Sequence, residues 1–103
     1  MLDHAERAER LGNGRPADAM RYDDILGAAI LRWLELLGES ANRVPRSDQD
    51  RFPQLPWRDM IGLRNLLIHQ YDRLNYTIIE RIIADELPPL IVALRAIIEQ
   101  EYS

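Results

Sequence analysis

Apolar residues recur at spacings of three and four along most of the chain, and no segment alternates strictly enough to indicate a β-strand. The clearest apolar stripe lies between Ala19 and Asn42, with Arg32, Glu35 and Glu39 on the opposite arc. Its members are Ile25, Ala29, Ile30, Trp33, Leu34, Leu37 and Ala41. The pattern predicts an all-α protein whose longest helix spans about residues 19–42.

Glycine and proline residues separate this helix from its neighbours. A charged helix over residues 1–12 should end at Gly12-Asn13-Gly14, because glycine and asparagine tolerate the backbone conformation that ends a helix. Three prolines and a polar run within residues 44–56 predict a loop with at most one helical turn. A further helix is predicted from residue 57 to residue 71 or 72.

Two more helices complete the predicted fold. One follows Asn75, whose side chain suits an N-cap, and its expected buried stripe is Ile78, Ile79, Ile82 and Ile83. Pro88-Pro89 opens the last helix, which should fray over residues 99–103. Its inward-facing residues are predicted to be Leu90, Leu94, Ile97 and Ile98. We therefore expect one domain, residues 1–103, folded as a small up-and-down bundle of four to five helices.

Length and composition limit the possible settings of this domain. A chain of 103 residues forms one core, and self-association would bury more surface, so a homodimer is expected. The longest apolar run, Leu87 to Leu94, is far below the roughly 18 residues of a membrane-spanning helix. The chain has no cysteine, and residues 1–10 are charged. These features predict a cytoplasmic protein without disulfides, thiolate metal sites or membrane insertion.

The charge balance bears on nucleic-acid binding. Thirteen basic residues, all of them arginine, stand against 17 acidic residues, which gives a net charge of -4. A chain with this charge repels nucleic acid unless its arginines gather in one place. Each arginine is a planar fork that can pair with a phosphate through two donors.

The candidate chemistry lies in the predicted helix that begins at residue 57. Arg64, Asn65, His69 and Tyr71 fall within about two helical turns. Arginine binds phosphate, and histidine can both take and give a proton near neutral pH. The combination indicates phosphodiester chemistry.

The geometry of one helix does not bring these groups together. Arg64 and His69 are separated by about 140° around the axis and about 7.5 Å along it. In a two-fold dimer, the arginine of one chain could converge with the histidine of the other. The opposite arc, with Met60, Leu63, Leu66 and Leu67, is the predicted core side. The polar arc also holds Trp57, Ile61 and Ile68, a mixture that predicts a partner surface.

Each candidate residue also has a purely structural interpretation. His69 could be stabilised by the end of its helix, and Arg64 could form an ion pair with Asp59 or Asp72. Asn65 and His69, four residues apart, could bond to each other, and Tyr71 could be half-buried packing. His4, in the charged first segment, is expected to face solvent.

Five segments, in order, resemble the HepT-like family of the HEPN superfamily, which are small helical ribonuclease toxins. The segments are Leu37-Gly38-Glu39-Ser40-Ala41, Pro53-Gln54-Leu55-Pro56-Trp57-Arg58-Asp59, Gly62-Leu63-Arg64-Asn65, His69-Gln70-Tyr71 and Asp85-Glu86-Leu87-Pro88-Pro89-Leu90. The family usually opens with a longer first helix than residues 1–12 allow, so the edge of the bundle is expected to differ. Glu39 matches the family but is interpreted as a solvated or ion-paired charge.

The resemblance implies a homodimer with an Arg-x4-His motif from each chain at a shared cleft. Arg64, Asn65 and His69 would be catalytic and would cut RNA without a metal or other cofactor, leaving a 2′,3′-cyclic phosphate. The implied partner is an MntA-like nucleotidyltransferase antitoxin that silences the toxin by transferring AMP to Tyr71. Two alternatives stay open: a catalytically inert, substrate-binding partner of a minimal nucleotidyltransferase, and a purely structural helical dimer.

Overall fold

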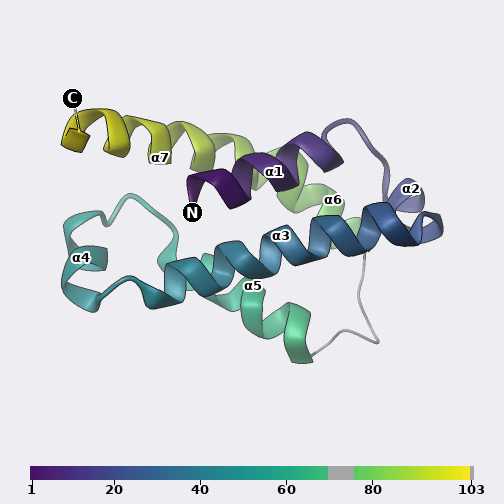
Figure 1. The fold of residues 1–103 in the computed structure, drawn as a ribbon, viewed down its shortest axis with the longest axis horizontal. Coiled ribbons are helices and arrows are strands. Elements are labelled where there is room, and N and C mark those ends of the chain that lie inside the picture. Colours follow the sequence, from purple (N-terminus) through teal and green to yellow (C-terminus); the bar gives the residue numbers. More distant parts are fainter. Residues whose placement is uncertain (70–75, 103) are drawn as a thin grey trace.

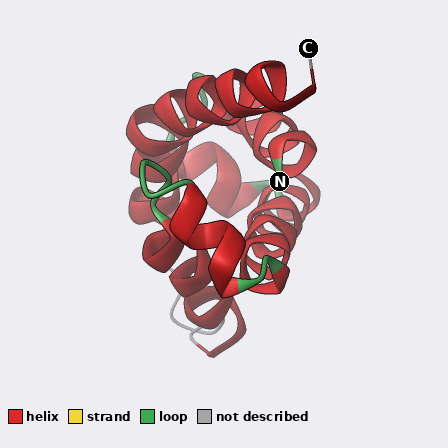
Figure 2. Ribbon diagram, turned by 90° about the vertical axis from the view of Figure 1, so that its left-hand side faces the viewer, coloured by secondary structure: helices red, strands yellow, loops and turns green. Residues whose placement is uncertain are grey.

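The computed structural model describes residues 1–69 and 76–102, without the side chains of Arg21, Asp24, residues 64–69 and Tyr102. The described residues form helices only, which confirms the predicted all-α class (Figures 1 and 2). The elements are α1 (Leu2–Gly12), α2 (Ala17–Tyr22), α3 (Asp24–Arg43), α4 (Arg46–Arg51), α5 (Trp57–His69), α6 (Tyr76–Arg81), the π-helical turn η2 (Ile82–Glu86) and α7 (Leu87–Tyr102).

The central helix α3 organises the packing. It contacts α1 on one side and α5 on the other, and α1 in turn packs against α7. The short helix α4 lies at one end of the molecule, and α2 and α6 lie at the other (Figure 1). Ile30, Leu34, Leu37 and Ala41 of α3 are fully buried, as their apolar spacing predicts. In α1 the buried residues are small: Ala5, Ala8 and Gly12.

The predicted longest helix is wrong at its start, because Asp23 divides it into α2 and α3. Asp23 has extended backbone (φ -108, ψ 96), and its side chain accepts a hydrogen bond from the N–H of Leu26 at 3.0 Å. This N-cap satisfies an amide that the first turn of α3 leaves unpaired. Ile25, in the first turn of α3, is 84% exposed rather than buried as expected.

The last two predicted helices are one uninterrupted helical segment. The π-helical turn joins α6 to α7, and the N–H of Leu87 bonds to the carbonyl of Ile82, five residues earlier. Pro88 and Pro89 have no N–H, and a proline ring collides with the carbonyl four residues before it in a regular helix. The wider turn just before them relieves that collision, so the helix continues through the prolines.

Side chains of this segment follow the predicted stripe only in part. Ile79, Ile82 and Ile83 are buried, but Ile78 and Ile98 are each 41% exposed, contrary to expectation. The end of α7 remains helical to Tyr102 instead of fraying. Within the described residues, no helix combines the length and apolarity needed to cross a bilayer.

The prediction that His4 faces solvent is wrong. Its Nδ1 lies 3.1 Å from the hydroxyl oxygen of Ser40, and its ring centroid lies 5.8 Å from that of Trp33. Both partners belong to α3, so His4 ties α1 to the central helix. The periodicity of residues 1–12 alone could not reveal this, because the contact depends on residues about 30 positions away.

Candidate functional site

The candidate site lies on α5, whose first half is held firmly in place. Met60 is 2% exposed and belongs to the hydrophobic core. The indole N–H of Trp57 donates to the carbonyl of Phe52 at 2.9 Å, which fixes the start of α5 to the segment that follows α4. The second half of α5 therefore extends from a rigid base.

The sequence-predicted site residues lie on or after this second half. Arg64, Asn65 and His69 are part of α5, and His69 is its last residue, so their predicted place on a helix is confirmed. Their side chains, and Tyr71, lie outside what the structure describes. Their convergence at one site, and the structural alternatives for each, stay predictions.

A groove runs between α4 and the first half of α5. We call it the α4–α5 groove; its lining residues are Arg46, Gln49, Asp50, Pro53, Trp57, Arg58, Ile61 and Gly62. It encloses about 720 Å³. Asn65 and His69 follow Gly62 by three and seven residues, which places all three within about 60° of one another around the helix axis. The groove therefore lies along the polar arc of the motif.

The mixed character of this arc now has a partial structural explanation. Trp57 and Ile61 are half-buried and pack against the hydrophobic core, which accounts for part of the apolar surface on this arc. Both also line the groove, and the partner surface stays a prediction. Ile68, the third apolar residue of the arc, is among the side chains that are not described.

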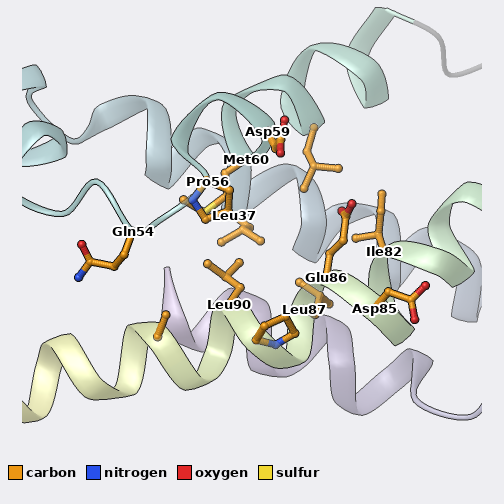
Figure 3. A pocket seen from close by; sticks show the side chains of 13 residues that line it. Leu37, Gln54, Pro56, Asp59, Met60, Ile82, Asp85, Glu86, Leu87 and Leu90 are labelled. Carbon is orange, nitrogen blue, oxygen red and sulfur yellow. The ribbon is translucent and has the colours of Figure 1, made fainter.

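A second groove opens on the core side of α5, and we call it the acidic groove (Figure 3). It has a volume of about 330 Å³ between α5, α3 and the η2–α7 segment. Its floor is apolar, with Leu37, Met60 and Leu90, while Asp59, Asp85 and Glu86 lie at its edge. Among the described residues no three acidic or histidine side chains are close enough to hold a metal ion.

The two grooves differ in charge. The α4–α5 groove is lined by two arginines and one aspartate, with Arg46 paired to Asp50 at 3.4 Å. Among its described lining residues the acidic groove has three carboxylates and no basic residue. These described charges favour an anion in the α4–α5 groove over the acidic groove. The sequence alone predicts neither groove. For the α4–α5 groove the available signal is the polar run 46–51, for which we expected a loop with at most one helical turn and which forms the helix α4.

Comparison with known proteins agrees with the resemblance predicted from the sequence. A family model described as "Ribonuclease HepT-like" matches residues 1–97. An inferred RNase of Methanocaldococcus jannaschii is 36% identical over 62 residues, or 60% of this chain and 57% of the relative. An inferred RNase of Caldanaerobacter subterraneus subsp. tengcongensis is 34% identical over 79 residues, or 77% of this chain and 70% of the relative.

An inferred ribonuclease HepT of Thermococcus cleftensis is 31% identical over 62 residues, or 60% of this chain and 56% of the relative. The chain thus matches less than two thirds of the length of the first and the third of these relatives. No solved structure matches the chain. The family match nevertheless spans nearly all of the described helices, including the whole of α5. The chain belongs to the HepT-like ribonuclease family.

Proposed function

We propose that this protein is the toxin of a toxin–antitoxin pair, a cytoplasmic endoribonuclease that cuts RNA without a metal ion. Membership of a ribonuclease family supports the general activity. The observation that carries the proposal is that Arg64, Asn65 and His69 lie on one helix, and that the positions of Asn65 and His69 share its side with a groove lined by Arg46 and Arg58. The excess of acidic residues in the chain makes such a local gathering of arginines necessary for RNA binding.

The proposed reaction is attack by a ribose 2′-hydroxyl on the neighbouring phosphorus. The 2′-oxygen bonds to phosphorus while the bond from phosphorus to the 5′-oxygen breaks, which leaves a 2′,3′-cyclic phosphate and a free 5′-hydroxyl. One proton leaves the 2′-hydroxyl and one reaches the departing 5′-oxygen. His69 performs one of these transfers, Arg64 stabilises the extra negative charge on the phosphate oxygens, and Asn65 contributes an amide donor.

The proposed active unit is a homodimer. Arg64 and His69 lie about 140° apart around α5, so one helix cannot aim both at the same phosphate. A two-fold axis beside α5 would place Arg64 of one protomer near His69 of the other. The family resemblance supports this arrangement.

The proposed regulator is a nucleotidyltransferase antitoxin that transfers AMP from ATP to the Tyr71 hydroxyl and releases pyrophosphate. Tyr71 stands two residues after His69. A nucleotide attached there would occupy the cleft and add negative charge, which excludes an anionic substrate by volume and by repulsion.

The decisive experiment compares the two histidines. Purified wild type should cleave RNA and arrest growth when expressed, and His69→Ala and Arg64→Ala should lose both effects while keeping their melting temperatures. His4→Gln is the matched control, because His4 contacts Ser40 at the α1–α3 contact and Gln can replace that hydrogen bond. Harmless expression of the wild type and of both site variants would instead favour an inert, substrate-binding partner. A lowered melting temperature of His69→Ala, with no RNA cleavage by the wild type or by any variant, would favour a structural dimer.

A further inference from the structure

We propose that the α4–α5 groove binds the RNA nucleotide that flanks the cleaved linkage. Its phosphate would lie on Arg58 and Arg46, and its base would lie against Trp57. This inference rests on the proposed ribonuclease function and extends it to residues outside the Arg-x4-His motif.

Charge is the first argument. Arg58 is exposed, lines the groove, and forms no hydrogen bond or ion pair within the part of the chain that the structure describes. The Arg46 side chain is 87% exposed, and within the described residues its one ion pair is the 3.4 Å contact with Asp50 on the same short helix. An exposed pair of this kind is weak, so a phosphate can compete with Asp50 for Arg46 at a small cost in free energy. Among the described lining residues, two guanidinium groups stand against one carboxylate.

Position along α5 is the second argument. Arg58 precedes Asn65 by seven residues, which returns it to nearly the same face about 10 Å along the axis. It precedes His69 by about 16 Å, so a phosphate held by His69 lies beyond the reach of Arg58. Arg58 therefore meets a neighbouring part of the same RNA strand rather than the linkage being cut.

The walls of the groove are the third argument. Trp57 lines it with an aromatic surface, and its indole N–H is already bonded to Phe52, so the ring is fixed in place. A preset aromatic surface beside cations is how single-stranded nucleic acid is held without regard to base identity. Gly62 leaves the wall open, since a Cβ at this position would have no heavy atom within 4 Å.

The test uses His69→Ala protein, which should not cleave RNA, and a fluorescent oligouridylate of six nucleotides, the hexanucleotide. Fluorescence anisotropy gives the dissociation constants. Adding Arg58→Ala should weaken hexanucleotide binding by about three- to tenfold, the effect of one exposed ionic contact. It should also reduce the slope of log affinity against log salt by about 0.7, the value for one single-strand phosphate. Arg81→Ala on α6, at the other end of the molecule, is the charge-matched control and should change neither quantity.

Gly62→Leu supplies a second test that removes no charge. The Cβ of the new leucine would meet no heavy atom within 4 Å, and its side chain would extend into the groove, so hexanucleotide affinity should fall while the melting temperature does not decrease. Hexanucleotide binding that is unchanged in both Arg58→Ala and Gly62→Leu would overturn the inference. A change in the molecular mass of Gly62→Leu in solution would also overturn it, because the groove would then be a contact between copies of the chain. Neither result would affect cleavage by the wild type, which tests the proposed function separately.

Discussion

The hydroxyl oxygen of Ser40 lies 3.1 Å from Nδ1 of His4, and this contact joins α1 to α3. His4→Ala should lower the free energy of unfolding by about 1–2 kcal/mol, because it removes the hydrogen bond and the packing on Trp33. The expected fall in melting temperature is roughly 5–10 °C for a domain of this size. Thermal unfolding followed by circular dichroism measures it. Ser40→Ala and the double variant complete the cycle, and strictly additive effects would contradict a direct contact.

Two glycines inside helices should respond to alanine in opposite ways. A Cβ on Gly27 of α3 would lie 2.6 Å from the carbonyl oxygen of Met20, so Gly27→Ala must push α2 away from α3. We expect a loss of about 1–3 kcal/mol, as for other overpacked sites. Gly62→Ala meets nothing and should gain up to about 1 kcal/mol from helix propensity. Urea unfolding of both variants checks the signs; a stabilised Gly27→Ala protein would disprove the close approach of α2 and α3.

Much of the fold could be predicted because it depends on the spacing of apolar residues and on helix-ending residues close together in the sequence. The stripe from Ile30 to Ala41 locates the core side of α3, and the sequence Gly12-Asn13-Gly14 marks the end of α1. The break at Asp23 was missed because the apolar stripe begins at Ile25 and does not show where the helix starts. The π-helical turn was missed for a different reason: proline in a helix normally indicates a boundary, and only the wider turn lets the helix pass through Pro88.

The candidate site shows the same division between local and distant information. That Arg64, Asn65 and His69 share a helix follows from spacing alone. The α4–α5 groove does not, because it depends on Arg46 and Arg58 being brought together by the fold of the proline-containing segment between them. Trp57 illustrates the difficulty: its hydrogen bond to Phe52 anchors the start of α5, and its place on the polar arc does not reveal that bond.

The proposed chemistry predicts insensitivity to metal removal. Because His69 transfers the proton and Arg64 stabilises charge, RNA cleavage should continue at an unchanged rate in excess chelator. The products should carry 2′,3′-cyclic phosphate ends, detectable by mass spectrometry. Cleavage that stops with chelator and returns with a divalent cation would rule out this scheme.

Tyr71 should be the site of regulation. Incubation with the cognate nucleotidyltransferase and ATP should add one adenylyl group to Tyr71, and cleavage should fall in parallel with modification. Tyr71→Phe should escape both effects. Tyr22→Phe is the matched control, because Tyr22 is 81% exposed and therefore accessible to a transferase. Full inhibition of wild type without any mass increase would point to simple occlusion by the partner.

Mixing two inactive variants tests whether the site is shared between protomers. Arg64→Ala and His69→Ala homodimers each lack one group at both sites. A mixed dimer would have one site with both groups intact if arginine and histidine come from different protomers, and none if they come from the same protomer. After subunit exchange, about half the dimers are mixed and each has one working site of two, so roughly a quarter of wild-type activity should return. The measurement is RNA cleavage before and after exchange; complete inactivity of the mixture, once mass spectrometry shows mixed dimers, would mean that the two groups do not act across the interface.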